Sequence, residues 1–212
     1  AGSLLGRMHG AAETRDGVFW IETRRLWLRW PRACDVETLA PWIGKPEVAE
    51  MTAMWPIGID RDGIAARIAA GRTGNTSGGK LVLVITAREA TETAIGQVGI
   101  ALEPGGSARL GYHLDPSHWG QGLMTEAVAA LADWTFILTR VAQITAGVRT
   151  NNPASRRVRE KCGFHPTGTL AWESPVRGPM QLDGFALGRQ RLAIPPSALV
   201  RAPAREQVTE TI

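Results

Sequence analysis

The sequence contains few cysteines, no long apolar run and no dense basic stretch. Its 212 residues include only two cysteines, Cys34 and Cys162, and neither lies near a histidine pair at metal-ligand spacing. We therefore expect neither a disulfide scaffold nor a metal site, and reduced thiols indicate a cytoplasmic protein. No apolar run approaches the roughly 20 residues of a membrane-spanning helix, so we expect no membrane association.

The charge balance is mildly basic. Lysines and arginines number 24 against 20 acidic residues, which gives a formal net charge of +4. Such an excess would attract a small anionic ligand. Basic residues are not interleaved with aromatic ones in any stretch, so we expect no direct binding to nucleic acids.

The length of the chain suits one domain with extensions. We predict a loose N-terminal arm over residues 1–17, a single domain over residues 18–193 and a C-terminal tail over residues 194–212. The arm has no clear hydrophobic period, and the tail is rich in proline and alanine.

Hydrophobic periodicity and turn residues predict helices on a mixed sheet. In the first half we expect a strand over 19–30, a helix over 35–42 with Asp35 as its N-cap, a helix over 61–70 capped by Asp60, and a glycine-rich loop over 71–80. In the second half we expect antiparallel strands over 81–86, 94–102 and 107–114, a helix from 122 to 138, a strand over 143–148 parallel to its predecessor, a helix over 153–162, and strands over 169–173 and 185–191. The fold class is α+β, with a twisted, mostly antiparallel sheet flanked by helices.

The stretch Leu110 to Met124 is where these elements suggest chemistry. A strand is broken by Asp115-Pro116 and followed by a turn with Gly120 and Gly122 that opens a helix. A helix start leaves backbone N–H groups without partners and favours an anion, and glycine lets the backbone approach a phosphate. From these residues alone, either a tight turn or an anion site is consistent with the pattern.

Two longer segments carry a family resemblance. The run GYHLDPSHWGQGLMTEAV, followed after a strand by VRTNNPASRRVREKCGF, resembles the acetyl-CoA-binding core of the GNAT acyltransferase superfamily. Within it, the opening IETRRLWLRWPRACDVETLAPW and the strand around Asp183-Gly184-Phe185 are similar to ribosomal-protein N-terminal acetyltransferases of the RimJ/RimL type. The likeness covers residues 19–192.

The resemblance implies an N-acetyltransferase that moves an acetyl group from acetyl-CoA to a primary amine. The family's diphosphate motif, [Gln/Arg]-x-x-Gly-x-[Gly/Ala], falls on Trp119, Gly122 and Met124, and the first and last depart from it. The pantetheine arm would lie between two splayed strands, with backbone amides of Tyr112 or Leu114 polarising the thioester. The cofactor-binding residues that the resemblance predicts are Tyr112, His113, Leu114, Trp119, Gly120, Gln121, Gly122, Leu123, Met124, Thr125, Asn152 and Ser155.

The resemblance also bears on catalysis. Many members carry a tyrosine as general acid seven residues after the position of Asn152, and this chain has Arg159 there. Ser155 is the alternative acid, although a helix-start hydrogen bond would equally explain it. The candidate bases that deprotonate the amine are Glu173, then His113, then Glu103. Glu126 would complement the dipole of its helix.

The acceptor would be bound by two loops, residues 43–59 and 174–182, and is either a protein N-terminus or a small-molecule amine. The side chains that suggest an apolar pocket are Trp42, Met51, Met54, Trp55 and Trp172, and ordinary core packing would also explain Met51, Met54 and Trp55. Arg177 would meet an acidic group of the acceptor.

Two other readings stay open at this point. One is a CoA-binding module that has lost catalysis and acts as a sensor or partner subunit, which the missing tyrosine favours. The other is a nucleotide-binding glycine turn. The sequence leaves open whether the protein forms a homodimer.

Overall fold

A computed structural model describes residues 20–189 of the chain. The predicted arm over residues 1–17 and tail over residues 194–212 lie outside the described residues, so both stay predictions. The described elements are β1 (Ile21–Glu22), β2 (Leu26–Arg29), α1 (Asp35–Leu39), α2 (Pro46–Ala49), α3 (Arg61–Ser77), β3 (Lys80–Ala87), β4 (Ala90–Glu103), β5 (Ser107–Leu114), the 3-10 helix η2 (Pro116–His118), α4 (Leu123–Leu138), β6 (Gln143–Arg149), α5 (Pro153–Lys161), β7 (His165–Ser174) and β8 (Gly178–Gly188).

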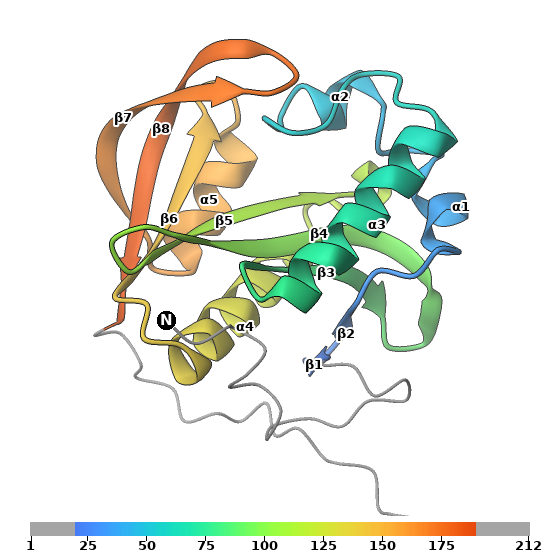
Figure 1. Cartoon of the computed structure of the whole chain (residues 1–212), viewed down its shortest axis with the longest axis horizontal. Coiled ribbons are helices and arrows are strands. Elements are labelled where there is room, and N and C mark those ends of the chain that lie inside the picture. The colour runs from blue at the N-terminus through green and yellow to red at the C-terminus, as the bar shows by residue number, and fades with distance from the viewer. Residues whose placement is uncertain (1–19, 190–212) are drawn as a thin grey trace, which may run out of the picture.

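The strands form one sheet of eight, in the order β1-β2-β3-β4-β5-β6-β8-β7 (Figure 1). Every neighbouring pair is antiparallel except β5 and β6, which run parallel. Helix α4 connects these two strands, as a parallel pair requires a crossover connection. The predicted mixed, mostly antiparallel sheet and its parallel pair are therefore confirmed.

Helices cover both faces of the sheet, and alternation along the strands supplies an apolar surface to each. On β3, Leu83 and Ile85 belong to the main core, which includes α4 residues such as Leu131. Val84, between them, belongs to a second core with Ile64 and Ile68 of α3. Both layers are visible in Figure 1, where α3 and α4 lie on opposite sides of the sheet.

The segment predicted as one strand over residues 19–30 is instead a tight hairpin, as far as it is described. The amide of Thr23 donates to the carbonyl oxygen of Leu26 over 2.9 Å, and the Leu26 amide donates to the Thr23 hydroxyl over 3.0 Å. This turn separates β1 from β2, which pair antiparallel. The continuous alternation of residues on either side of the turn gives no sign of it.

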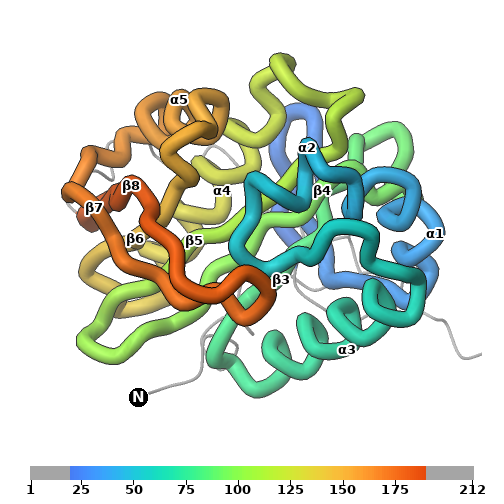
Figure 2. The backbone as a smooth tube through the Cα atoms, turned by 90° about the horizontal axis from the view of Figure 1, so that it is seen from above, coloured from blue at the N-terminus to red at the C-terminus, as the bar shows by residue number. Residues whose placement is uncertain are grey.

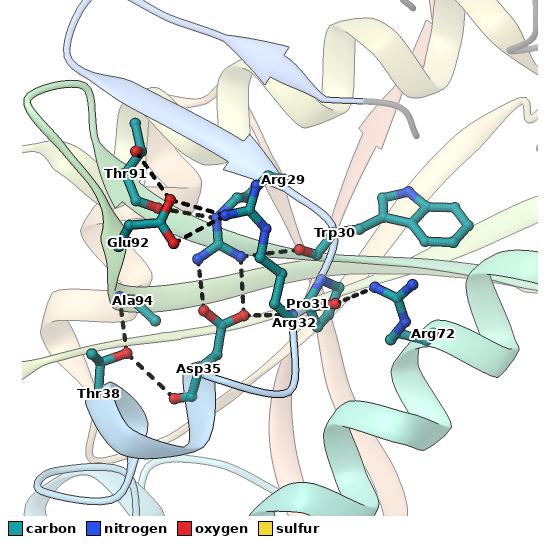
Figure 3. A network of polar contacts seen from close by, with 10 residues as sticks. All are labelled: Arg29, Trp30, Pro31, Arg32, Asp35, Thr38, Arg72, Thr91, Glu92 and Ala94. Carbon is teal, nitrogen blue, oxygen red and sulfur yellow. Dashed lines mark hydrogen bonds and ion pairs between the residues drawn. The ribbon is translucent and has the colours of Figure 1, made fainter. Parts of the chain in front are cut away.

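Asp35 is not the N-cap that its position in the sequence suggests. It is the first residue of α1, which ends at Leu39, and its carboxylate is fully buried. Arg29 donates to both carboxylate oxygens, over 3.0 and 2.6 Å, and the Arg32 amide adds a third bond of 2.7 Å (Figure 3). Arg29 also donates to the carbonyl oxygen of Thr91 in β4. The pair therefore joins β2, α1 and β4 in the interior.

The predicted glycine-rich loop over residues 71–80 is wrong in its first part, because α3 continues to Ser77. A Cβ at Gly71 would lie 3.6 Å from Val82, and one at Gly74 would lie 2.3 Å from Lys80. The glycines therefore let the helix lie close to β3. Asn75 fixes this contact, since its side chain both donates to and accepts from the backbone of Val82.

The other elements agree with prediction apart from their ends. Helix α4 covers the expected residues, and α5 begins with Pro153 at its first position. Strands β7 and β8 are longer than predicted and form a hairpin. The predicted loop over residues 43–59 contains the one-turn helix α2.

Candidate active site

Strands β5 and β6 separate partway along their length, and this opening is the centre of the site. Their ladder ends at the pair Arg109↔Thr145, whereas β5 stays paired with β4 as far as Leu114. The opening therefore lies between residues 110–114 of β5 and 146–149 of β6. Figure 1 shows the two strands running apart here.

Alternate backbone groups of β5 face this opening. The amide of Asp115, just beyond the strand, donates to Ile95 of β4 over 2.8 Å. Successive peptide groups of a strand point to opposite sides, so the amides of Leu114 and Tyr112 point away from β4. The carbonyl oxygen of Ala108 accepts from the Thr145 hydroxyl of β6. Residue 108 therefore faces β6, and residues 112 and 114 face the same side because they are two and three alternations further along the strand. The amides predicted to polarise a thioester are thus directed toward the opening.

The turn before α4 has the shape of an anion cradle. Gly120 and Gly122 adopt φ angles of 76° and 75°, which L side chains rarely adopt. Gly122 is the N-cap of α4 and makes no side-chain capping bond. The first three amides of the helix, at residues 123–125, have no carbonyl partner within it. A diphosphate fits the donors and the dipole of this turn.

Two residues far apart in sequence hold the cradle in place. The carboxylate of Glu126 accepts from the amide and the Nε of Arg25, over 2.8 and 2.7 Å, and from the Thr23 hydroxyl over 2.7 Å. Arg25 in turn donates to the carbonyl oxygen of Gln121 over 2.9 Å. Partial burial would raise the pKa of Glu126, but the hydrogen bonds from Thr23 and Arg25 hold it below its usual value. Glu126 therefore does more than complement the helix dipole, and the sequence gives no sign of Arg25.

Trp119 joins the cradle to the opening. Its indole Nε1 donates to the carbonyl oxygen of Leu114 over 2.8 Å, while its side chain is among the exposed large apolar groups. The Asp115 carboxylate accepts from the Ser117 amide and so shapes the turn between them. The strand, turn and helix that the sequence predicts as one binding stretch are thus one connected unit.

Helix α5 brings Asn152 and Ser155 to the same region. The Asn152 side chain accepts from the Ser155 amide over 2.9 Å, which is an N-cap bond. The Tyr112 phenol lies 3.0 Å from the Ser155 hydroxyl. Arg159, one turn further on, lies over the Tyr112 ring at 4.4 Å. Sequence reasoning assigned Tyr112 only a backbone role and noted Arg159 only as the substitute for a tyrosine.

The opposite face of β5 carries Arg109, Gly111 and His113, and we call it the Gly111 face. Gly111 is exposed although β5 is a central strand, and a Cβ there would meet no atom of the described residues within 4 Å. His113 lies between the rings of Trp42 and Trp55, at 5.8 and 5.2 Å. The face is therefore open at Gly111 and closed by aromatic rings at His113.

His113 is a weak candidate for a base that works near neutral pH. Its Nε2 is buried and has no hydrogen-bond partner among residues 20–189. Burial, together with the nearby charge of Arg67, lowers its pKa to about 3. The imidazole is therefore neutral at physiological pH and has little tendency to take up a proton.

The two carboxylates predicted as bases have surroundings of their own. Glu103 forms an ion pair with Arg109, whose guanidinium lies 3.8 Å over the Trp172 ring. Glu173 is exposed, and strand alternation puts its side chain on the opposite face of β7 from Trp172. The structure thus brings Tyr112, Ser155 and Asn152 together, and within residues 20–189 no hydrogen bond or ion pair joins Glu173 or Glu103 to them.

The two loops predicted to bind the acceptor are bonded to each other. The Ser174 hydroxyl donates to the carbonyl oxygen of Ala53 over 2.6 Å. Arg177 donates to the carbonyl oxygens of Ala49, Thr52 and Trp55, over 2.6, 3.1 and 3.0 Å. Figure 2 shows the turn between β7 and β8 beside the segment that follows α2. The guanidinium of Arg177 thus binds this loop, whereas the sequence suggested an acidic group as its partner.

The apolar side chains of these loops divide between core and surface. Trp42 and Trp55 are buried in the second core, Met51 and Trp172 are half-buried, and Met54 is exposed. Core packing therefore describes Trp42 and Trp55, whereas Met51, Met54 and Trp172 remain available to line a pocket.

The described part of the chain contains neither a membrane-spanning helix nor a group of metal ligands. No helix within residues 20–189 is long and apolar enough to cross a membrane. Among the same residues, no group of three His, Cys, Asp or Glu side chains is placed to hold a metal ion.

Comparison with known proteins agrees with this geometry. The probable N-acetyltransferase YjcK of Bacillus subtilis is 47% identical over 72 residues, which is 34% of this chain but only 40% of that protein. The uncharacterized N-acetyltransferase p20 of Bacillus licheniformis is 28% identical over 163 residues, 74% of this chain and 89% of that protein.

The fold is shared with solved acetyltransferases. A structure of Mycobacterium smegmatis RimJ in complex with CoA-disulfide matches with a TM-score of 0.68 and 24% identity, over 84% of this chain and 89% of that one. The sequence profile that describes the acetyltransferase (GNAT) domain matches residues 25–165. Because that match covers more than half of the chain, the protein belongs to the GNAT acetyltransferase family, and the predicted class of acetyl-CoA-dependent acetyltransferase is confirmed.

Proposed function

We propose that this chain transfers the acetyl group of acetyl-CoA directly to a primary amine that approaches over the Gly111 face. The observation that carries this proposal is the position of Gly111. It is an exposed glycine on a central strand, next to the Tyr112 amide that faces the β5–β6 opening. A side chain at this position would stand where an acceptor must come close to the thioester.

The cosubstrate follows β5 and the cradle. The diphosphate binds the amides of residues 119–125, with Arg25 adding positive charge beside Gln121. The pantetheine arm lies in the β5–β6 opening, and Asn152 at the start of α5 bonds to it. The amides of Tyr112 and Leu114 stabilise the oxyanion that forms when the amine attacks the thioester carbonyl.

The reaction requires a neutral amine and a proton for the leaving thiolate. Ser155 donates that proton in this proposal. The amine loses its own proton through water, and Glu173 stays the first predicted base, ahead of His113 and Glu103. Holding both substrates in place supplies much of the rate.

The acceptor is either a protein N-terminus or a small-molecule amine. Solved structures of the same fold include RimL, described as a ribosomal L7/L12 alpha-N-protein acetyltransferase, so protein N-termini are the first acceptors to test. A panel of peptides and small amines in a thiol-release assay would decide between the two classes.

The variant Gly111→Val tests the proposed approach of the acceptor. Space for the side chain is available, so the fold should persist, and we expect kcat/KM for the amine to fall at least about 30-fold with unchanged affinity for CoA. Gly188→Val is the matched control, since Gly188 also lies in a strand and its Cβ would meet nothing within 4 Å. Equal activity of Gly111→Val and wild type would refute the proposed approach.

The same assays distinguish an inactive CoA-binding module and a nucleotide-binding turn from an acetyltransferase. If wild-type protein binds CoA but releases no thiol with any amine, the chain is a CoA-binding module. If ATP or NAD, and not CoA, raises the melting temperature, the turn binds another nucleotide. We expect CoA alone to raise it.

We also propose that the protein forms a homodimer in the cytoplasm and does not bind nucleic acids directly. Strand β7 ends the sheet, pairs only with β8 among the described strands and is largely exposed, so its free edge can pair with a second copy. Cys34 and Cys162 are free thiols, which suits a reducing compartment. Light scattering after size-exclusion chromatography tests the assembly, and a monomer at high concentration would contradict it.

A further inference from the structure

Arg159 is a buried cation without an ionic partner among residues 20–189. Only 3% of its surface is exposed, and its Nε has no hydrogen-bond partner in the described part of the chain. Within residues 20–189, no carboxylate forms an ion pair with it. An unpaired buried charge lowers the stability of a fold, so its presence beside the site calls for a functional explanation.

The contacts of Arg159 all lie within one small group. Its guanidinium is centred 4.4 Å from the Tyr112 ring, and its Nη1 donates to the Ser155 hydroxyl oxygen over 3.4 Å. The Tyr112 phenol lies 3.0 Å from the same oxygen and 3.3 Å from the Ser155 carbonyl oxygen. Burial raises the pKa of Tyr112, and the charge of Arg159 opposes that rise.

This arrangement limits the hydrogen bonds that Ser155 can make, although either hydroxyl can donate in its contact with Tyr112. Arginine only donates, so the Ser155 oxygen must accept from Arg159. When the Tyr112 phenol also donates to that oxygen, both lone pairs of Ser155 are used. Its hydrogen is then free to point elsewhere, and Ser155 lies in the first turn of α5, which follows the end of β6 that borders the opening.

We propose that Tyr112 and Arg159 are positioning residues of a proton relay that ends at the leaving thiolate of CoA. This inference rests on the proposed acetyl transfer and adds two side chains to it. Arg159 orients Ser155 and stabilises negative charge on the relay, and Tyr112 supplies the next proton. The phenol that other members carry seven residues after Asn152 is thus provided here by β5.

The proton balance of the step is complete. The amine nitrogen forms a bond to the acetyl carbon, and the carbon–sulfur bond breaks with its electron pair on sulfur. The thiolate takes the Ser155 hydrogen, and Ser155 takes the hydrogen of Tyr112. The tyrosinate is held by Arg159 until a proton from water restores it, while the new amide gives its extra proton to solvent.

The test compares Arg159→Met, Tyr112→Phe and Ser155→Ala in the thiol-release assay. We expect kcat to fall about 100-fold in each, because general acid catalysis contributes on that order. The KM for acetyl-CoA should change less than about threefold. Arg159→Met should melt at the same temperature as wild type or higher, since methionine removes the buried charge. A merely structural role for Arg159 predicts a lower melting temperature instead.

Further measurements keep the test sharp. Arg157→Met, an exposed neighbour on α5, is the matched control and should keep full activity. Arg159→Lys should recover part of the lost kcat. We expect kcat of wild type to fall at alkaline pH, because the Tyr112 phenol ionises and can no longer supply a proton. This fall should be absent in Tyr112→Phe.

Two results would overturn the inference, and they are distinguishable. If wild type acetylates an amine and Arg159→Met retains its kcat within about twofold, the relay is refuted and the proposed function stands. If wild type releases no thiol with any amine, both are refuted.

Discussion

Arg25 reaches across 101 residues of sequence to bond Glu126 through both its backbone amide and its side chain. The same guanidinium donates to Gln121 in the cradle, so β2 and the start of α4 are held as one unit. The amides of the cradle can bind a diphosphate only if they are held in the right positions. The bonds of Arg25 to Glu126 and Gln121 hold them there before the ligand binds.

Arg25→Met should weaken CoA binding. Loss of the guanidinium frees the cradle and removes a positive charge beside it, so we expect the Kd for CoA to rise about tenfold, or roughly 1.4 kcal/mol. Isothermal titration calorimetry measures this directly. Arg24→Met is the control, because Arg24 is exposed and adjacent. Equal Kd values for the two variants would show that the bond pair does not preorganise the cradle.

Removing one partner of the buried pair Arg29 and Asp35 should lower stability more than replacing both. Asp35→Ala leaves Arg29 without its bidentate partner in the interior, and we expect the free energy of unfolding to fall by about 3–5 kcal/mol. The double variant Arg29→Met/Asp35→Leu should lose less, because neither charge is then buried unpaired. Urea denaturation gives both values.

The exposed pair Arg61 and Glu37 is the control for this measurement. Both side chains are more than half exposed, so removing either should change stability by less than about 1 kcal/mol. A double variant that is less stable than Asp35→Ala would contradict the explanation by an unpaired charge.

How much the sequence predicts depends on whether the signal is local. The cradle lies within one strand–turn–helix segment, so its glycines and helix start predict it without knowledge of the rest. The glycines of α3 mislead, because their low helix propensity is overridden by close packing on Val82. Tyr112 and Ser155 are 43 residues apart, and no periodicity indicates that their hydroxyls meet.

The surroundings of the candidate bases also depend on contacts between residues far apart in sequence. Alternation predicts which residues share a face of a strand, so it separates His113 from Tyr112 without showing what surrounds either side chain. Burial and then the charge of Arg67 lower the pKa of His113, and the rings of Trp42 and Trp55 that pack against it come from loops whose path depends on the complete fold. The position of Glu173 likewise depends on the twist and register of the last hairpin.

His113 should make stability depend on pH. Its pKa falls to about 3 in the folded state from the ordinary histidine value of 6.5, so on acidification the unfolded chain binds a proton before the folded one. The stability is fully present above pH 6.5 and is lost as the pH falls toward 3, by up to about 1.4 kcal/mol per pH unit. His113→Gln should show a correspondingly smaller loss between pH 7 and pH 4.5.

Urea denaturation at the two pH values measures this difference. His165→Gln is the control, since His165 is exposed on β7, and it should keep the wild-type dependence. Parallel pH dependence in His113→Gln and wild type would show that His113 is not buried in its neutral form.

Arg177→Met should affect the acceptor and spare CoA. Its guanidinium bonds three carbonyl oxygens of residues 49–55, so its loss detaches this segment from the β7–β8 turn. We expect KM for the amine to rise about tenfold, which corresponds to one strong charged hydrogen bond, with an unchanged KM for acetyl-CoA. Ser174→Ala should act in the same direction, and the double variant should lose less than the sum because both residues bind one segment. Lys161→Met, exposed on α5, is the control. An increase confined to the KM for acetyl-CoA would place the segment at the cosubstrate instead of the acceptor.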